Sequence, residues 1–159
     1  MGTSELNLPQ EGNAITVYYP MDKQAKPASA NKYWLNYREN DKYFIAKTLI
    51  DAWWGNNAPA WMRYAGRHLT IPVMPDGPLS EDFCTRDRKL LPVIFSHGLT
   101  AHRGCYAINA MEFASHGYIV FCMDHLDGSN SYTERKVYDY YEAVEFDTSF
   151  PWYNAENMN

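Results

Sequence analysis

Two short apolar runs separated by one helical pattern constrain the fold of this chain more than any other feature. Residues 90–95 and 118–123 are nearly continuous hydrophobic segments, which is typical of strands buried in a parallel sheet. Between them, apolar side chains recur at helical spacing, at Tyr106, Ala110, Phe113 and Ala114. Gly117 follows where a helix C-cap belongs. This order predicts a βαβ unit with a right-handed crossover, and hence an α/β fold.

Parallel strands of this kind need cover on both faces and at both edges. We therefore expect a sheet that is incomplete within these 159 residues, with an open edge and an exposed apolar face. Either a missing C-terminal half or a protein partner covers that edge. Residues 1–89 are expected to hold a strand, aromatic helices and a connector. Residues 90–159 are expected to hold the βαβ core, a loop and a polar tail, so that the two segments form one partial domain.

Local patterns predict the remaining elements. β-branched and aromatic residues indicate strands, three- and four-residue apolar steps indicate helices, and Pro and Gly indicate connections. In chain order, we expect a loop over 1–13, a strand over 14–20, a surface connection over 21–31, a helix over 40–54, a helix or turn over 58–64, an irregular connector over 71–89 and a short helix over 134–145. Pro59 suits the first turn of the second helix.

Charge and cysteine usage exclude several classes of function. The net charge of −5, without a Lys/Arg block, argues against a nucleic-acid partner. The spacing of Cys84, Cys105 and Cys122 fits neither a disulfide framework nor a CxxC metal or redox motif. With no apolar leader and no long apolar window, we expect an intracellular protein, cytoplasmic or organellar, without a signal peptide or membrane span. Its many tyrosines are compatible with peripheral membrane contact.

The turn after the first apolar run suggests chemistry. His97 and Gly98 end a buried strand and precede a helix, and ligands of open α/β sheets bind at the carboxyl ends of strands. In α/β-hydrolases an HG motif opens the loop that supplies one backbone N–H of the oxyanion hole. Glycine leaves room for the backbone to approach the developing oxyanion. The alternative is a plain strand-to-helix turn in which His97 is a packed residue.

An ordered series of matches extends this motif. Residues 91–99, Tyr106, residues 113–120 and residues 124–131 together resemble the platelet-activating factor acetylhydrolase family. Residues 15–20 fit the lead-in of that family more loosely. The resemblance implies the N-terminal part of an α/β-hydrolase, a serine esterase and phospholipase A2 that hydrolyses short or oxidised acyl chains at the sn-2 position of phospholipids. It implies no metal and no cofactor.

The match carries specific residues into this chain. Leu99 stands where the family's backbone N–H oxyanion donor lies, and His97 and Gly98 shape its loop. His125, Asp127 and Ser129 align with a stretch that borders the active site and the substrate. Leu126 and Gly128 replace two arginines of that stretch. Thr100 stands where the family usually has glycine.

The family's nucleophile is not found in these residues. No Gly-x-Ser-x-Gly occurs in the sequence, and the family's Ser, Asp and His lie in segments beyond the matched ones. We therefore expect this chain to be inactive as an esterase on its own. The alternative is a non-catalytic structural or interaction subunit, derived from the family, within a larger assembly.

Two improvised sites are disfavoured by the sequence. Ser96 and His97 are chain neighbours whose side chains diverge, so that they do not form a nucleophile–base pair. His102, His116 and His125 each have a plain structural explanation, such as a helix-dipole contact for His116. A metal site among His97, His125, Asp124 and Asp127 has no ligand spacing behind it.

Overall fold

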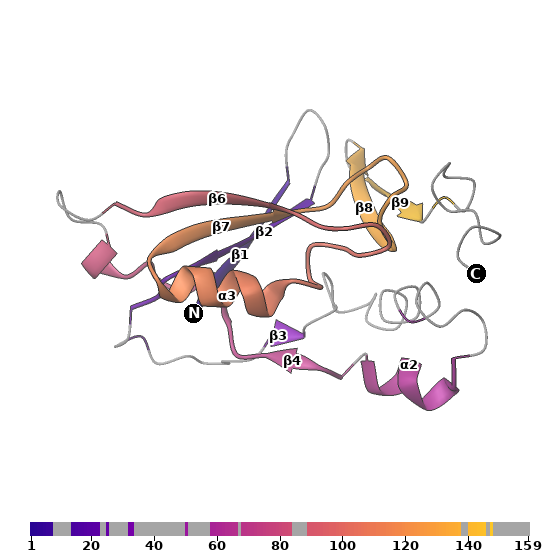
Figure 1. Cartoon of the computed structure of the whole chain (residues 1–159), viewed down its shortest axis with the longest axis horizontal. Coiled ribbons are helices and arrows are strands. Elements are labelled where there is room, and N and C mark those ends of the chain that lie inside the picture. The colour runs from indigo at the N-terminus through magenta and orange to yellow at the C-terminus, as the bar shows by residue number, and fades with distance from the viewer. Residues whose placement is uncertain are drawn as a thin grey trace.

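A mixed β-sheet forms the centre of the molecule in the computed structural model (Figure 1). The structure describes residues 1–7, 14–22, 25, 32–33, 50, 58–66, 68–83, 89–137, 140–145 and 147. In this part of the chain the sheet has five strands in the order β5-β1-β2-β7-β6. They are β1 (Gly2–Asn7), β2 (Ala14–Tyr19), β5 (Met74–Pro75), β6 (Leu91–Ser96) and β7 (Tyr118–Met123).

Smaller elements surround the sheet. The described residues form a pair of short strands, a hairpin, two α-helices and a 3-10 turn. These are β3 (Lys32–Tyr33) with β4 (Thr70–Ile71), β8 (Tyr132–Val137) with β9 (Tyr140–Glu145), α2 (Ala60–Gly66), α3 (Ala107–Ser115) and η3 (Glu81–Phe83).

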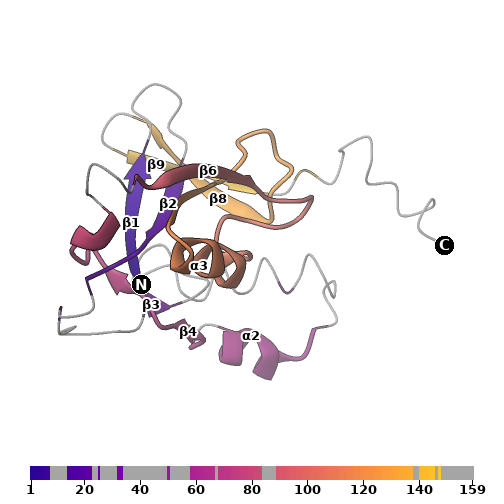
Figure 2. The same cartoon turned by 60° about the vertical axis from the view of Figure 1, so that its left-hand side comes forward.

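The predicted βαβ unit is confirmed. β6 and β7 pair in parallel, from Leu91 opposite Tyr118 to Ser96 opposite Met123, and α3 connects them. α3 packs against β7 and β2 on one face of the sheet (Figure 2). Three fully buried alanines, Ala107, Ala110 and Ala114, bring the helix close to Val120 and Tyr18. Phe113 was expected in this buried stripe but lies partly exposed, because the alanine face turns toward the sheet instead.

Gly117 ends α3 in the way the sequence predicts. Its φ of +92° lies in the left-handed region, which side chains other than glycine rarely adopt. Its N–H donates to the carbonyl of Ala114 over 3.1 Å, which satisfies one of the last helical carbonyls. A Cβ at this position would come within 2.7 Å of the Phe83 ring. Gly117 therefore fixes both the end of the helix and the start of β7.

β6 is less buried than its apolar sequence predicts. Leu91 is 56% exposed and Ile94 is 74% exposed, so the exposed apolar face expected of the incomplete sheet is confirmed for the described part of the chain. The expected open edge is confirmed there, since β6 has only β7 as a neighbour. An uncovered apolar strand edge is a template for pairing with further polypeptide.

Two sequence expectations are wrong. Residues 1–13 were expected to form a loop, yet Gly2–Asn7 is a strand that pairs antiparallel with β2, from Gly2 opposite Tyr19 to Asn7 opposite Ala14. The expected helix over 134–145 is the β8–β9 hairpin. In both segments pairing with a neighbouring strand outweighs weak local propensity.

Three of the remaining expectations are confirmed where the structure describes the chain. The strand over 14–20 is β2, and the aromatic helix over 58–64 is α2, which begins directly after Pro59. The connector over 71–89 is irregular where described, apart from part of β4, β5, which pairs with β1, and the turn η3. The helix over 40–54 lies outside the described residues, except for Ile50.

Substitution of Gly117 tests this account of the βαβ unit. We expect Gly117→Ala to destabilise the chain by at least about 1–2 kcal/mol. The left-handed φ is unfavourable for alanine, and its Cβ would clash with the Phe83 ring. Chemical denaturation monitored by circular dichroism measures the change. Gly98→Ala is the matched control, since a Cβ there meets only the Tyr106 hydroxyl at 3.4 Å. Equal effects of the two substitutions would contradict the account.

Candidate active-site loops

Two loops meet at the carboxyl ends of β6 and β7. Residues 97–106 follow β6, and residues 124–131 follow β7. The Thr100 N–H donates to the Ser129 carbonyl over 2.8 Å, and the Ser131 N–H donates to the Ala101 carbonyl over 3.0 Å. These backbone hydrogen bonds hold the predicted oxyanion loop against the loop of His125, Asp127 and Ser129.

The buried side chain of His97 forms hydrogen bonds to both loops. Its side chain is only 6% exposed, and its Nδ1 lies 2.8 Å from the carbonyl of Gly98. Its Nε2 accepts the N–H of His125 over 3.2 Å. Since a carbonyl only accepts, the ring carries its proton on Nδ1. Burial lowers the pKa of His97, in agreement with a neutral ring that shapes the turn.

The amide of Leu99 differs from those beside it. The Thr100 and Ala101 amides donate to the carbonyls of Ser129 and Gly98, whereas the Leu99 N–H donates no hydrogen bond within the described part of the chain. Leu99 itself is 45% exposed. The φ of Gly98 lies outside the left-handed region, and a Cβ there would meet only the Tyr106 hydroxyl, at 3.4 Å. Neither a left-handed backbone conformation nor a steric clash therefore requires glycine at this position.

Thr100 occupies a strained conformation next to this amide. Its φ is +61°, in the left-handed region, which costs a β-branched residue about 1–2 kcal/mol. This value explains why glycine suits the position. The hydrogen bond from the Thr100 N–H to Ser129 helps to hold the strained residue in place.

A buried ion pair that the sequence patterns did not indicate anchors the loop after β6. The guanidinium of Arg103 binds a carboxylate oxygen of Asp124 through Nη1, and the Arg103 backbone N–H donates to the other oxygen over 2.5 Å. The hydroxyl of Thr133 also donates to the carboxylate over 2.6 Å. Both charged side chains are almost completely buried. An acid directly at the carboxyl end of a buried strand was the available signal for this pair.

The same arginine reaches the N-terminal strands. Its Nε donates to the Thr16 hydroxyl over 2.9 Å, and its Nη2 lies 3.4 Å from Glu5. The Thr16 hydroxyl in turn lies 3.0 Å from both carboxylate oxygens of Glu5. Arg103 therefore connects the loop to β1, β2 and β7 together. Asp124, bound by Arg103 and Thr133, is committed to this network rather than to the metal site considered above.

The structure pairs Ser96 with His125 rather than with His97. The Ser96 Oγ lies 2.9 Å from the His125 Nε2, at the ends of the neighbouring strands β6 and β7. The His97 and His125 rings pack with centroids 4.3 Å apart. As expected, Ser96 and His97 diverge, since Ser96 is exposed and His97 is buried.

Asp127 and Ser129 form a local turn in the second loop. The Ser129 N–H donates to Asp127 Oδ1 over 2.9 Å. Hydrogen bonds from Ser129 lower the pKa of Asp127, with a smaller contribution from the nearby His125. In the described part of the chain, no group of three His, Cys, Asp or Glu side chains is arranged to hold a metal ion. The described residues also contain no helix with the length and hydropathy needed to cross a membrane.

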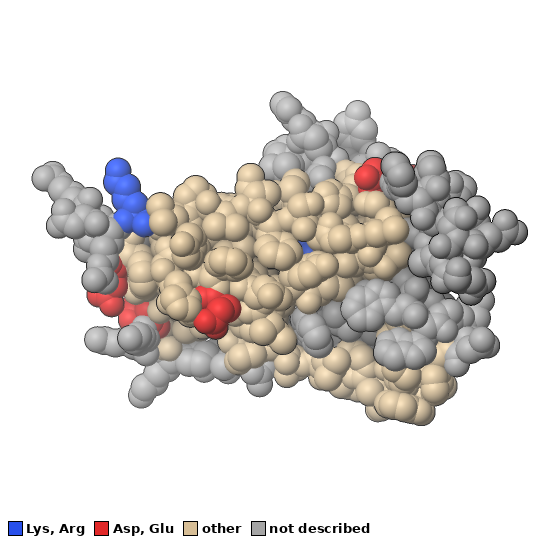
Figure 3. Space-filling model, viewed as in Figure 1, with Lys and Arg blue, Asp and Glu red and all other residues tan. Residues whose placement is uncertain are grey.

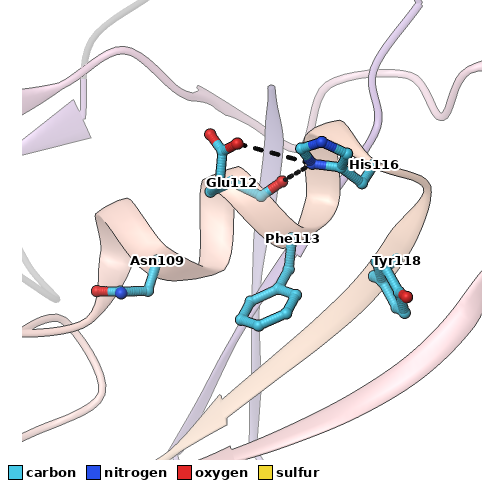
Figure 4. Close-up of a pocket in the computed structure, with 5 residues that line it drawn as sticks. All are labelled: Asn109, Glu112, Phe113, His116 and Tyr118. Atoms are coloured by element: carbon cyan, nitrogen blue, oxygen red, sulfur yellow. Dashed lines mark hydrogen bonds and ion pairs between the residues drawn. The ribbon is translucent and has the colours of Figure 1, made fainter.

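A hollow of about 650 Å³ lies at the other end of the βαβ unit (Figure 4). It is lined by Asn109, Glu112 and Phe113 of α3, by His116 just after that helix and by Tyr118 at the start of β7. His116 Nδ1 donates to the Glu112 carbonyl over 2.9 Å, a contact typical of a helix C-terminus. The hollow is therefore separate from the loops at the carboxyl ends of the strands.

The mixed sheet, its βαβ unit and the loops at the carboxyl edge define an α/β-hydrolase-like fold, present here in part. A ferulic acid esterase from Streptomyces cinnamoneus has a similar solved structure, with a TM-score of 0.54 and 17% sequence identity. The similarity covers 91% of this chain and 37% of the esterase.

Residues 3–150 match the family described as platelet-activating factor acetylhydrolase, isoform II, and the chain belongs to this family. It is 49% identical over 126 residues to a platelet-activating factor acetylhydrolase of Cavia porcellus, and 29% identical over 125 residues to that of Canis lupus familiaris. These alignments cover 77% of this chain, but only 26% and 25% of the two relatives. The chain thus spans about a quarter of their length.

Removing the arginine tests the anchor. We expect Arg103→Met to destabilise the chain by about 3–5 kcal/mol, because it leaves the Asp124 carboxylate buried without its cation. The double variant Arg103→Met/Asp124→Leu is the matched control and should recover part of the loss. Urea unfolding measures both. A cost below about 1 kcal/mol for Arg103→Met would contradict a structural anchor.

His102 makes stability depend on pH. It is fully buried, its Nδ1 accepts the Gly104 N–H over 3.0 Å, and burial lowers its pKa to about 4. The unfolded chain therefore binds a proton at higher pH than the folded chain. His102 thus contributes stability above about pH 6.5 that is lost as pH falls toward 4, by up to about 1.4 kcal/mol per unit.

Urea unfolding at several pH values between 4 and 7 measures how the free energy of unfolding changes with pH. His102→Gln keeps an acceptor for Gly104 without a titrating ring, so its unfolding free energy should fall less steeply with decreasing pH. An unchanged slope in the variant would assign the acid sensitivity to other groups.

Proposed function

We propose that this chain is the oxyanion-loop part of a platelet-activating factor acetylhydrolase-like serine esterase. The observation that carries the proposal is the Leu99 N–H, which donates no hydrogen bond in the described structure while the amides of Thr100 and Ala101 do. Membership of the family and the esterase-like fold support it. In this proposal the amide stabilises negative charge on the carbonyl oxygen of an ester as that charge develops.

The proposed substrate is a phospholipid with a short or oxidised acyl chain at the sn-2 position. A serine attacks the ester carbonyl, and the carbonyl oxygen becomes an oxyanion that accepts a hydrogen bond from Leu99. The neutral His97 ring, bound to Gly98 and His125, holds the loop in the conformation in which the Leu99 N–H can donate to the oxyanion. His125, Asp127 and Ser129 border the substrate in this proposal, because their loop is bonded to that of Leu99 through Thr100 and Ser131.

The nucleophile, its acid and its base are proposed to come from polypeptide outside these 159 residues. The sequence has no Gly-x-Ser-x-Gly, and the relatives are about four times longer than the aligned segment. Without these groups the chain alone is proposed to be inactive toward phospholipids, since only stabilisation by the loop would remain.

The same additional polypeptide is the proposed cover for the open side of the sheet. Ile94 and Leu91 on β6, with Ile108 and Phe113 on α3, expose apolar side chains. Residues other than Lys, Arg, Asp and Glu dominate the described surface over these elements (Figure 3). A strand paired to the free edge of β6 would satisfy its backbone and bury part of this face.

Peripheral lipid contact is proposed at α2. Trp61 and Tyr64 of this short helix, and Leu69 after it, are among the exposed large hydrophobic side chains of the described residues. Trp and Tyr combine an apolar ring with a polar group and suit a membrane–water interface. Such contact would bring the site to its substrate.

The proposal is tested on the native protein that contains these residues and on its variants. Leu99→Pro removes the amide hydrogen and should lower kcat for hydrolysis of 1-alkyl-2-acetylglycerophosphocholine about 10²–10³-fold. Leu99→Ala keeps the amide and serves as the control, with kcat close to the wild type. The melting temperature of each variant separates loss of the donor from loss of folding.

Two results would overturn the proposal. One is an equal loss of kcat in Leu99→Pro and Leu99→Ala, which would remove the amide from the mechanism. The other is native protein that neither hydrolyses the phospholipid nor carries a serine reactive to fluorophosphonate outside residues 1–159. That second result would favour a non-catalytic subunit.

A further inference from the structure

A serine and a histidine lie together at the carboxyl edge of the sheet, beside the proposed oxyanion loop. The Ser96 Oγ and His125 Nε2 are 2.9 Å apart, within hydrogen-bond reach. Ser96 is exposed at the end of β6, while His125 is half-buried just after β7. A serine hydroxyl that contacts an imidazole nitrogen is the arrangement by which a base activates a weak nucleophile.

We propose that Ser96 and His125 form a nucleophile–base pair that accepts an acyl or phosphonyl group from activated esters and fluorophosphonates. The site lies within the 159 residues and uses no group supplied from outside. It is therefore separate from phospholipid turnover, for which the proposed nucleophile lies elsewhere. Both proposals use the Leu99 N–H as a donor, but absence of an adduct on Ser96 would leave the proposed phospholipid turnover standing.

The backbone around His125 is fixed in a way that suits a base. Its N–H donates to His97 Nε2, and the two rings pack with centroids 4.3 Å apart. His97 is buried and hydrogen-bonded as a neutral ring, so it places no full positive charge beside His125. The carboxylate of Asp127, two residues on, interacts electrostatically with His125.

The same turn supplies a donor for the developing oxyanion. Leu99 follows Ser96 by three residues, and its N–H donates no hydrogen bond within the described residues. The exposed position of Ser96 admits a small ester from solvent. Nucleophile, base and donor thus come from two loops that are already bonded to each other through Thr100 and Ser131.

The chemical step balances within these groups and the reagent. With p-nitrophenyl acetate, the Ser96 Oγ forms a bond to the acetyl carbon and its proton passes to His125 Nε2. The bond between the acetyl carbon and the phenolic oxygen breaks, and nitrophenolate leaves. With a fluorophosphonate, the Oγ bonds to phosphorus, the P–F bond breaks and fluoride leaves.

The chain contains a second Ser–His contact that serves as a comparison. Ser115 Oγ lies 3.1 Å from His116 Nδ1, and both residues are exposed. However, the Ser115 hydroxyl donates to the Glu112 carbonyl over 2.7 Å, and His116 Nδ1 donates to the same carbonyl. A nitrogen that carries a proton cannot accept one, so Ser115 has no base and should stay unmodified.

The experiment treats the purified 159-residue chain with p-nitrophenyl acetate and, separately, with a fluorophosphonate. Intact mass and peptide mapping locate the adducts. We expect one adduct per chain, on Ser96, and its loss in Ser96→Ala. His125→Gln should slow labelling about 100-fold or more, the scale of general-base catalysis. Ser115→Ala should label at the wild-type rate.

Three outcomes would overturn the proposal: no adduct on the wild-type chain, adducts spread over several serines, or labelling of Ser96 at an unchanged rate in His125→Gln. If His125→Gln does not fold, the wild-type chain still decides between the remaining outcomes, because Ser96 and Ser115 are compared within one molecule. Circular dichroism establishes which variants are folded.

Discussion

The buried ion pair between Arg103 and Asp124 is the interaction on which the site depends. It joins the loop after β6 to the end of β7, and through Thr16 and Glu5 it also reaches β2 and β1. Burying two charges is costly unless their remaining donors and acceptors are satisfied. Here the side chains around the pair supply several such hydrogen bonds. The network therefore ties the loops at the carboxyl edge to the strands of the sheet.

Two features of the loop differ from this hydrogen-bonded framework: the strained Thr100 and the Leu99 amide. Most groups of the turn are engaged: His97 bridges Gly98 and His125, and Thr100 is held in a strained conformation by Ser129. The Leu99 amide is left without a partner in the described structure. Strain and unpaired donors tend to concentrate at functional sites. Because the chain belongs to the platelet-activating factor acetylhydrolase family, we propose that this amide is an oxyanion donor.

How far the sequence could predict this structure differs between its elements. The βαβ unit was predictable because apolar runs, the alanine face of α3 and Gly117 are local signals. The strand Gly2–Asn7 and the β8–β9 hairpin were not, because their stability comes from pairing with distant or neighbouring strands. The family resemblance pointed to Leu99 and to the departure at Thr100. It could not reveal the Arg103–Asp124 and Ser96–His125 contacts, which join residues more than twenty positions apart.

Amide hydrogen exchange of the 159-residue chain, followed by NMR at single residues, tests the central claim most directly. The account predicts that Leu99 exchanges at nearly the rate of an unprotected amide, while Thr100 and Ala101 are protected by their bonds to Ser129 and Gly98. Protection of Leu99 equal to that of Thr100 would mean that its amide is engaged within the fold. An engaged amide would contradict the oxyanion loop described above.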